Sequence, residues 1–463
     1  MLKKNQLENL LSYAMKSEAD FAEIFEEDTD HEGISMLNED VEDINRSVVA
    51  GAGIRLYKNQ ESVYAYTNDL SEDSLYALID DLREALGAKS DGPAVHLEEV
   101  VIENAHPIEI DPFSTPLEEE VDLIVRASKS AKEVDEKIVK TQGSLASTRQ
   151  YVQIANSNGR LVRDVRRRSR LVLHAFASDG TRMKNGQDSP GASKGLEYFM
   201  KERTPESIGK EAARLALVLL DAKPAPSGSM PVIIDNGFGG VIFHEACGHS
   251  LEATGVAKNQ SVFAGKKGQK IANEKVSAVD DGTIANAWGS QNVDDEGNPQ
   301  RLRVLIKDGI LNEYMVDQLN GRRMKEASSG SGRRQSYKYE PTSRMSNTFI
   351  LPGKDKKEDM FKGIKRGLYA KRMGGGSVNP NTGEFNFGVL EGYLIEDGKI
   401  TDPVEGAMLI GSGAEILQKI DMVADNLERA QGMCGSISGS IPTDVGQPTI
   451  RVSSITVGGT ANE

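Results

Sequence analysis

The sequence contains few of the features that hold secreted or membrane proteins together. Only two of its 463 residues are cysteine, so a disulfide framework is excluded, and the two thiols are expected either to pack or to bind a metal. The longest purely apolar stretch covers residues 215–220, far short of the about 20 residues of a membrane span. The opening residues, MLKKNQ, do not lead into the apolar segment of a signal peptide. We therefore expect a cytoplasmic protein without a membrane span.

Positive charge is also scarce, because 55 Lys and Arg residues face 70 Asp and Glu residues, which gives a net charge of -15. This balance disfavours binding to nucleic acid. One basic run stands out, formed by Arg160, Arg163, Arg166, Arg167, Arg168 and Arg170. It lacks the interleaved aromatic residues of a base-stacking surface, so it more plausibly supplies counter-charges at domain or subunit contacts. A second cluster, formed by Arg322, Arg323, Lys325, Arg333 and Arg334, suits a mobile loop over a site or a partner contact.

The length and the glycine distribution indicate two domains. At roughly 150 residues per domain, the chain has room for two or three domains. Residues 1–224 hold 12 of the 46 glycines and the remainder holds 34. The stretch 221–229, DAKPAPSGS, has the proline and small polar residues of a linker. We predict an N-terminal domain over residues 1–222 and a strand-rich C-terminal domain over residues 223–463.

The local patterns favour an α+β fold. Helices are predicted over Leu75–Leu86, from Thr115 with Pro116 at the first helical position, and from Thr204. Residues 150–155 and 161–177 alternate like strands around the turn NSNG, and the sequences KDG at 307–309 and EDG at 396–398 resemble hairpin turns. The last strand is predicted over residues 449–457. The first domain should therefore hold a mixed sheet with helices.

The most informative segment runs from a short apolar strand through glycines into a helix. Residues 243–253 read FHEACGHSLEA, with His244, Glu245 and His249 in one turn and a half. Two imidazoles and an adjacent carboxylate on one helix are typical of metallopeptidases, in which the imidazoles hold zinc and the carboxylate takes a proton from water. A buried pair of hydrogen-bonded histidines would show the same residues.

The two histidines are five residues apart, one more than a regular helix allows. A spacing of four separates two side chains by about 40° around the helix axis, whereas five separates them by about 140°. Either a π-bulge absorbs the extra residue or the helix breaks near Gly248, a residue type that tolerates distortion.

The segment resembles the signature of the TldD/PmbA family of proposed modulators of DNA gyrase, specifically its TldD side. The likeness extends along nearly the whole chain and is strongest after residue 225. The stretches that resemble the family are YAYTNDL (64–70), DDEG (294–297), GRRQSY (332–337), MSNT (345–348), GGG (374–376), KIDM (419–422), PTIR (448–451) and VGGT (457–460).

This resemblance implies a zinc-dependent peptidase. The family's ligands map onto His244, His249 and Cys434, and Glu245 would be the general base. Thiolate suits zinc, and three protein ligands leave one position open. Cys247 and Glu252 remain competing ligands. Glu252 could instead form a hydrogen bond to a metal ligand without binding the metal itself.

The resemblance also implies a paralogous TldE/PmbA-type subunit, although a homodimer stays open. The expected substrates are peptides or unfolded proteins, presented as extended chains that add a strand to a sheet edge. The rival hypothesis is a non-enzymatic, metal-stabilised regulator of DNA gyrase.

Overall fold

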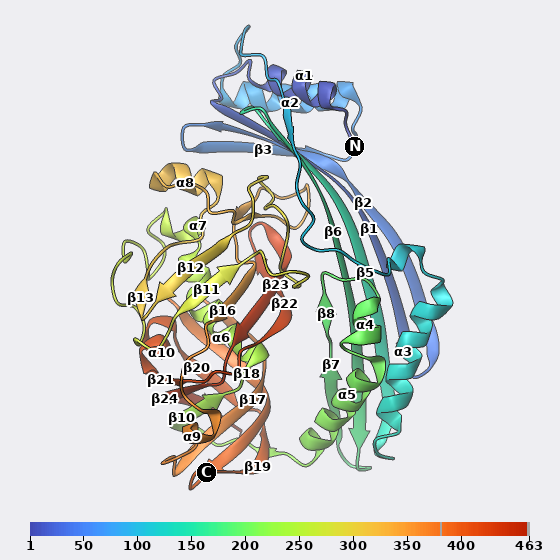
Figure 1. The fold of residues 1–463 in the computed structure, drawn as a ribbon, viewed down its shortest axis with the longest axis vertical. Coiled ribbons are helices and arrows are strands. Elements are labelled where there is room, and N and C mark those ends of the chain that lie inside the picture. The colour runs from blue at the N-terminus through green and yellow to red at the C-terminus, as the bar shows by residue number, and fades with distance from the viewer. Residues whose placement is uncertain (380–381, 461–463) are drawn as a thin grey trace.

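In the computed structural model, which describes residues 1–379 and 382–460, the first half of the chain is built on one mixed sheet. Its strand order is β3-β2-β1-β5-β6-β4, and β7 and β8 also pair with β6. The strands are β1 (Phe21–Leu37), β2 (Asp40–Lys58), β3 (Glu61–Thr67), β4 (Glu98–Val100), β5 (Ile138–Asn156), β6 (Arg160–Ser178), β7 (Met183–Asp188) and β8 (Gly191–Ala192). Figure 1 shows the long strands curving along one side of the molecule, with the second half of the chain beside them.

Helices cover this sheet at both ends and bury two separate apolar cores. At one end lie α1 (Lys4–Ala14) and α2 (Glu72–Leu86), whose leucines pack with Ile24 and Ile54 of the sheet. At the other end α3 (Leu117–Lys132) and α5 (Pro205–Leu220) pack together on β5, β6 and β7, and α4 (Glu197–Lys201) lies nearby. A short 3-10 turn, η1 (Pro112–Ser114), precedes α3.

The second half contains two larger sheets and a two-stranded one, β14 (Gly332–Arg333) with β15 (Thr342–Ser343). The first large sheet has the order β17-β10-β24-β20-β18-β19-β9, with β21 on β24, and the second has the order β13-β12-β11-β16-β23-β22. The first comprises β9 (Lys223–Pro224), β10 (Gly228–Ile234), β17 (Arg366–Val378), β18 (Glu384–Glu396), β19 (Lys399–Glu405), β20 (Met408–Ser412), β21 (Ile420–Val423) and β24 (Ile450–Gly458). The second comprises β11 (Ala278–Asp281), β12 (Leu302–Lys307), β13 (Ile310–Leu311), β16 (Asn347–Ile350), β22 (Glu428–Ser436) and β23 (Gly439–Gln447).

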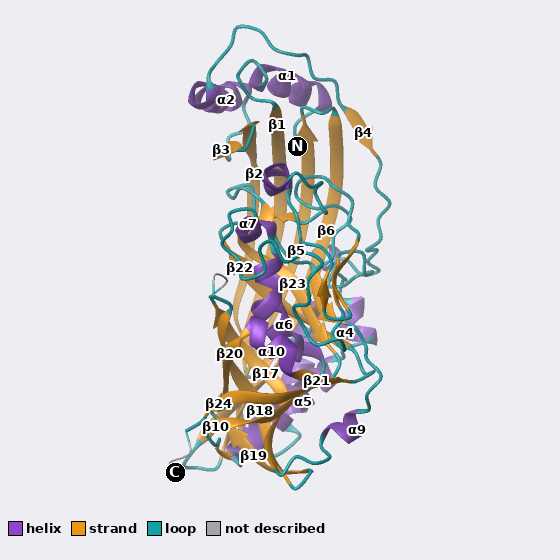
Figure 2. Cartoon of the chain, turned by 90° about the vertical axis from the view of Figure 1, so that its left-hand side faces the viewer, coloured by secondary structure: helices purple, strands orange, loops and turns teal. Residues whose placement is uncertain are grey.

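A chain of short helical turns lies between these two sheets. Two residues after β10, four turns follow one another directly: η2 (Gly237–Gly240), α6 (Val241–Phe243), η3 (His244–Gly248) and η4 (His249–Leu251). They contact β16 and β23 on one side and β17 and β18 on the other, so the segment is fixed in the largest apolar core (Figure 2). The remaining helices are α7 (Ala253–Val256), α8 (Gln318–Met324), α9 (Lys357–Met360) and α10 (Gly413–Lys419).

The predicted α+β class is confirmed, and most predicted elements are present. Both KDG and EDG form hairpin turns with positive φ at the Asp and the Gly, as at Asp308 (48°) and Gly309 (78°). The boundary at residues 222 and 223 remains a prediction. No helix in the described part of the chain is both long and apolar enough to cross a membrane.

Two predicted boundaries were wrong. The strand predicted over residues 150–155 starts earlier than expected. It is part of β5, which begins at Ile138 and pairs with β1 and β6 over nearly its whole length. Helix α3 begins at Leu117 with Pro116 as its cap residue, not as its first helical residue. The Thr115 hydroxyl does not cap this helix, since it donates to the Asp111 carbonyl of the preceding turn.

Candidate metal centre

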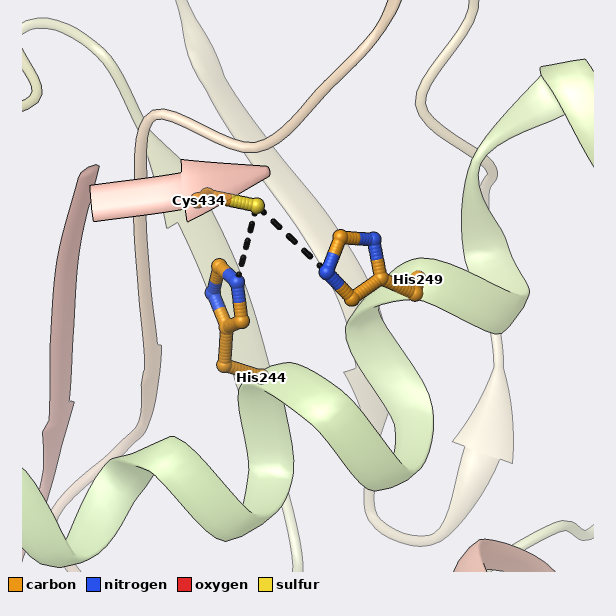
Figure 3. Close-up of side chains that lie close together, drawn as sticks. All are labelled: His244, His249 and Cys434. Atoms are coloured by element: carbon orange, nitrogen blue, oxygen red, sulfur yellow. Dashed lines mark hydrogen bonds between the residues drawn. The ribbon is translucent and has the colours of Figure 1, made fainter. Parts of the chain in front are cut away.

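The histidine segment forms a π-helical turn, as one of the two predicted alternatives requires. The turn spans His244–Gly248, and the backbone N–H of His249 donates to the carbonyl of His244, five residues earlier. The wider turn absorbs the extra residue and brings both imidazoles to one side of the segment (Figure 3). Their ring centroids lie 5.0 Å apart, and the planes cross at 84°.

Gly248 has a different role from the one predicted. Its backbone is ordinary right-handed helix, with φ of -53° and ψ of -54°, so tolerance of distortion does not explain it. A Cβ at this position would lie 2.2 Å from the Met345 sulfur. Any larger residue would therefore displace the Met345 side chain, which packs against the bare backbone beside His249, a constraint that one sequence does not reveal.

Cys434 reaches the two histidines from β22, almost 200 residues further along the chain. Its Sγ lies 3.2 Å from Nε2 of His244 and 3.4 Å from Nε2 of His249. Figure 3 shows the sulfur between the two rings. His244 and Cys434 are almost completely buried, and the three donor atoms lie within 4.8 Å of one another. Sulfur and nitrogen ligands of a tetrahedral zinc ion lie about 3.6 Å apart, so these residues fit such an ion.

The two cysteines have opposite chemistry. Burial raises the pKa of the Cys434 thiol, but the positive charges of His244 and His249 and their hydrogen bonds outweigh it and hold that pKa well below its ordinary value. The Cys247 thiol is completely buried in the apolar core, and burial alone raises its pKa. The lowered pKa and the position of Cys434 favour it as the thiol ligand of a metal, whereas the alternative ligand Cys247 lies outside the cluster.

Glu245 lies at the edge of the cluster. One of its carboxylate oxygens is 3.6 Å from Nε2 of His249, the same nitrogen that faces Cys434. Its side chain keeps 22% of its surface exposed, whereas the cluster itself is largely enclosed. This carboxylate can therefore exchange protons with a group at the cluster and with solvent.

Glu252 lies behind His249 rather than among the donors. Its carboxylate is 3.2 Å from Nδ1 of His249, whereas Cys434 faces Nε2, the other nitrogen of the same ring. A carboxylate at that nitrogen fixes the orientation and tautomer of a ligating imidazole. Burial lowers the pKa of His249, but the charges of Glu252 and Cys434 outweigh it, so the net shift is well upward.

Sequence reasoning missed Arg344, which ties the two parts of the centre together. Its guanidinium donates to the carbonyl of Cys434, to the Ser438 hydroxyl and to the carbonyl of Gly439, and its Nε lies 3.9 Å from the Glu252 carboxylate. It thereby fixes the β22–β23 hairpin relative to the histidine segment. Arg344 adjoins the MSNT stretch, but a lone arginine carries no spacing signal.

The basic run of β6 forms contacts between the two halves of the chain, as predicted. Arg166 pairs with Asp295, and Arg168 donates to the carbonyls of Trp288 and Ser290. These contacts use the arginines as counter-charges and hydrogen-bond donors inside the molecule.

The second basic cluster makes contacts within the chain rather than forming a mobile loop over a site, and the alternative of a partner contact stays a prediction. Arg322 pairs with Asp20 and Arg323 donates to the Gln60 carbonyl. Arg333 is buried, and the buried Arg334 pairs with Glu23. The cluster therefore holds the second half of the chain against the N-terminal sheet.

Two imidazoles and a thiolate are ligands that suit zinc, and a carboxylate beside such ligands is the general base of helix-based metallopeptidase sites. Sequence profiles of the PmbA/TldA metallopeptidases match three successive parts of the chain: domain 1 at residues 22–86, the central domain at 110–220 and the C-terminal domain at 227–459. The chain belongs to the PmbA/TldA metallopeptidase family, and is itself a metallopeptidase.

Individual relatives agree with this assignment. The chain is 38% identical to a metalloprotease TldD homolog of Haemophilus influenzae over 89% of this chain and 87% of that protein. Its fold is similar to that of a proposed modulator of a DNA gyrase from Thermotoga maritima, with a TM-score of 0.79 at 21% identity over 98% and 99% of the two chains. It is also similar to TldE from Thermococcus kodakarensis, with a TM-score of 0.76 at 20% identity over 98% and 100%.

Proposed function

We propose that this metallopeptidase uses zinc, held by His244, His249 and Cys434, to hydrolyse peptide bonds in extended or unfolded polypeptides. The observation that carries the proposal is the convergence of one thiolate and two imidazole nitrogens within 4.8 Å. A soft thiolate combined with imidazoles favours zinc over magnesium or calcium, which prefer oxygen ligands. When bound, zinc would polarise the scissile carbonyl and lower the pKa of water.

The chain's own residues would supply the proton transfers and the orientation. Glu245 would take a proton from the attacking water and later deliver it to the leaving amine nitrogen. Its position beside Nε2 of His249 and its access to solvent support that role. Glu252 would hold the His249 ring in place through Nδ1.

Extended substrates are supported by the place of β22 in its sheet. This strand is the last in the order β13-β12-β11-β16-β23-β22, so its outer edge has no partner strand among the described residues. Cys434 lies within it, between Met433 and Gly435, which are both exposed. A polypeptide that added a strand to this edge would pass beside the donor cluster.

A paralogous subunit is supported by the similarity to TldE, which shows that the fold occurs in a protein of that name. The chain also has a surface suited to a partner. Strand β3 pairs with β2 only at 52–58, so residues 40–51 of β2 form an uncovered edge with exposed Val41, Ile44 and Val48. We place the protein in the cytoplasm, because a reducing compartment keeps the metal-binding thiol available.

The experiment compares the full-length chain with Glu245→Gln, each supplied with the paralogous subunit. Bound zinc is measured first, and cleavage of a library of unstructured peptides is followed by mass spectrometry. We expect about one zinc per chain in both proteins and a loss of activity of about 10²–10⁴-fold in Glu245→Gln. The exposed carboxylate of Glu109 provides the control Glu109→Gln, which should cleave normally. Equal cleavage by wild type and Glu245→Gln, or no cleavage by any of them, would contradict the proposal and favour a binding role.

A further inference from the structure

A cavity of about 620 Å³ lies between the N-terminal sheet and the β22–β23 hairpin. Its lining contains one acidic residue, Glu27, and six basic ones. We call it the arginine pocket, defined by Arg166, Arg168, Arg170, Arg333, Arg334 and Lys338. So strong a local excess of positive charge is unexpected in a chain with a net charge of -15.

Much of this charge is not neutralised by the protein. Arg166 and Arg334 pair with carboxylates, but Arg168, Arg170, Arg333 and Lys338 form no ion pair with any carboxylate of the described residues. Burial of unpaired charge is costly unless another group compensates it. Of these four residues, Lys338 is exposed and Arg170 is partly buried, so the cost applies to Arg168 and Arg333, and an anion in the pocket would offset it.

Arg168 and Arg333 show this most clearly, because both are almost completely buried. Arg168 donates to the carbonyls of Trp288 and Ser290, and Arg333 donates to those of Met345 and Pro442. The Nε of Arg333 has no acceptor among the described residues. Burial, and then the charge of Arg333, lower the pKa of Arg168 to about 9.

The arginine pocket adjoins the strand that carries the metal ligand. Met433 and its cross-strand partner Pro442 line the pocket, and the next pair along the hairpin is Cys434 with Ile441. Successive side chains of a strand point to opposite faces. Met433 lines the pocket and Cys434 contacts the histidines, and the pocket also reaches Ile441, the partner of Cys434. The indole N–H of Trp288, another lining residue, donates to the carbonyl of Gly432.

We propose that the arginine pocket binds a carboxylate of the peptide substrate, an inference that rests on the proposed function. A peptide paired with the edge of β22 presents alternate residues to the two faces of the hairpin. One residue then lies at the metal centre while a neighbour reaches the pocket. Planar guanidinium groups bind carboxylates through paired hydrogen bonds. The carboxylate belongs either to an Asp or Glu side chain or to the C-terminus, and the two sources share this chemistry.

The chain's single tryptophan provides a direct test, because Trp288 lines the pocket. The zinc-loaded full-length Glu245→Gln protein, which should bind without cleaving, is titrated with three acetylated hexapeptides while tryptophan fluorescence is followed. One has a central Glu and an amidated end, the second has Gln and an amidated end, and the third has Gln and a free C-terminal carboxylate. We expect the Glu peptide, the free-carboxylate peptide or both to bind at least tenfold more tightly than the Gln amide.

Removing charge from the pocket should abolish this preference. The less buried residues are changed in Arg170→Gln/Lys338→Gln, which should lose at least tenfold in affinity for the carboxylate peptide at unchanged zinc content and melting temperature. Two exposed lysines give the charge-matched control Lys356→Gln/Lys362→Gln, which should bind like the parent.

Three outcomes would overturn the proposal: equal binding of all three peptides, unchanged affinity in the pocket variant, or binding of inorganic phosphate as tight as that of the peptide. Because the assay reads binding rather than cleavage, it distinguishes failure of the pocket from failure of the peptidase function. Carboxylate-selective binding without cleavage by wild type would retain the pocket and remove the hydrolytic role.

Discussion

The contact between the two halves of the chain and the metal centre both concentrate charged side chains, but they satisfy them differently. At the contact, Arg55 is completely buried between the carboxylates of Glu23 and Glu296, at 3.0 and 2.9 Å. Arg334 pairs with the second oxygen of Glu23. At the metal centre, Glu245 lies 3.6 Å from Nε2 of His249, has no Lys or Arg partner among the described residues and is partly exposed to solvent.

This difference separates structural from chemical roles. A buried charge that is paired with carboxylates of the protein fixes geometry, and removing one partner leaves the other charge buried without compensation. A group with spare hydrogen-bonding capacity at an enclosed donor cluster is available for reaction. Substitutions at the contact should therefore lower stability, whereas substitutions at the metal centre should lower metal binding or activity at nearly constant stability.

The largest effect is expected for Cys434→Ser. Loss of the thiolate should lower zinc affinity by more than about 100-fold, because losing a group that only hydrogen-bonds to a metal ligand already costs about 10–100-fold. The matched variant Cys247→Ala should retain zinc, because that thiol packs in the apolar core. Metal content by mass spectrometry and competition with a chelator measure both. Zinc loss in Cys247→Ala with retention in Cys434→Ser would reassign the ligand.

The next effect should appear at the contact between the halves. Arg55→Met leaves the Glu296 carboxylate buried without its cation, which should reduce the free energy of unfolding by about 3–5 kcal/mol. Removing the exposed lysine in Lys356→Met, whose partner Asp425 is also exposed, should cost at most about 1 kcal/mol. Urea unfolding checks both values. Similar losses in the two variants would remove the distinction between buried and exposed pairs.

More of the metal centre than of the rest of the fold could be predicted from the sequence. The spacing of His244 and His249 predicted an irregular turn, because helix geometry allows few ways to bring such residues together. Cys434 came only from family resemblance, since no periodicity links it to a segment 185 residues earlier. Arg344 and the Met345 packing that requires Gly248 are tertiary contacts, which a single sequence does not encode locally. The arginine run indicated a contact, but not which carbonyls would accept its hydrogen bonds.

A smaller effect is expected from the group behind the metal centre. Glu252→Gln keeps the size of the side chain but weakens the acceptor at Nδ1 of His249. Substitutions of groups that hydrogen-bond to a metal ligand lower metal affinity or activity by about 10–100-fold. Zinc titration together with peptide cleavage should show this loss without a change in unfolding. A loss as large as that of Cys434→Ser would instead make Glu252 a direct ligand.

The smallest effect concerns two buried carboxylates beside one cation, Arg46, which pairs with Glu32 and whose charge only partly offsets the upward shift of the Glu120 pKa. Glu120 of α3 and Glu32 of β1 are both almost completely buried. Burial, and then the neighbouring Glu32, raise the pKa of Glu120 to about 8, far above its value of about 4.3 in an unfolded chain. Between these two values the folded protein keeps a proton that the unfolded chain has lost.

Stability from this proton is therefore complete below about pH 4.3 and is lost as pH rises towards 8. Compared with Glu120→Gln, which carries no titrating proton, the wild type should lose melting temperature between pH 5 and pH 9, by about 1 °C for each kcal/mol in a chain of 463 residues. Differential scanning calorimetry of both proteins across that range measures the difference. Parallel curves would show that Glu120 is already ionised in the folded protein, so that Arg46 beside it compensates both carboxylates.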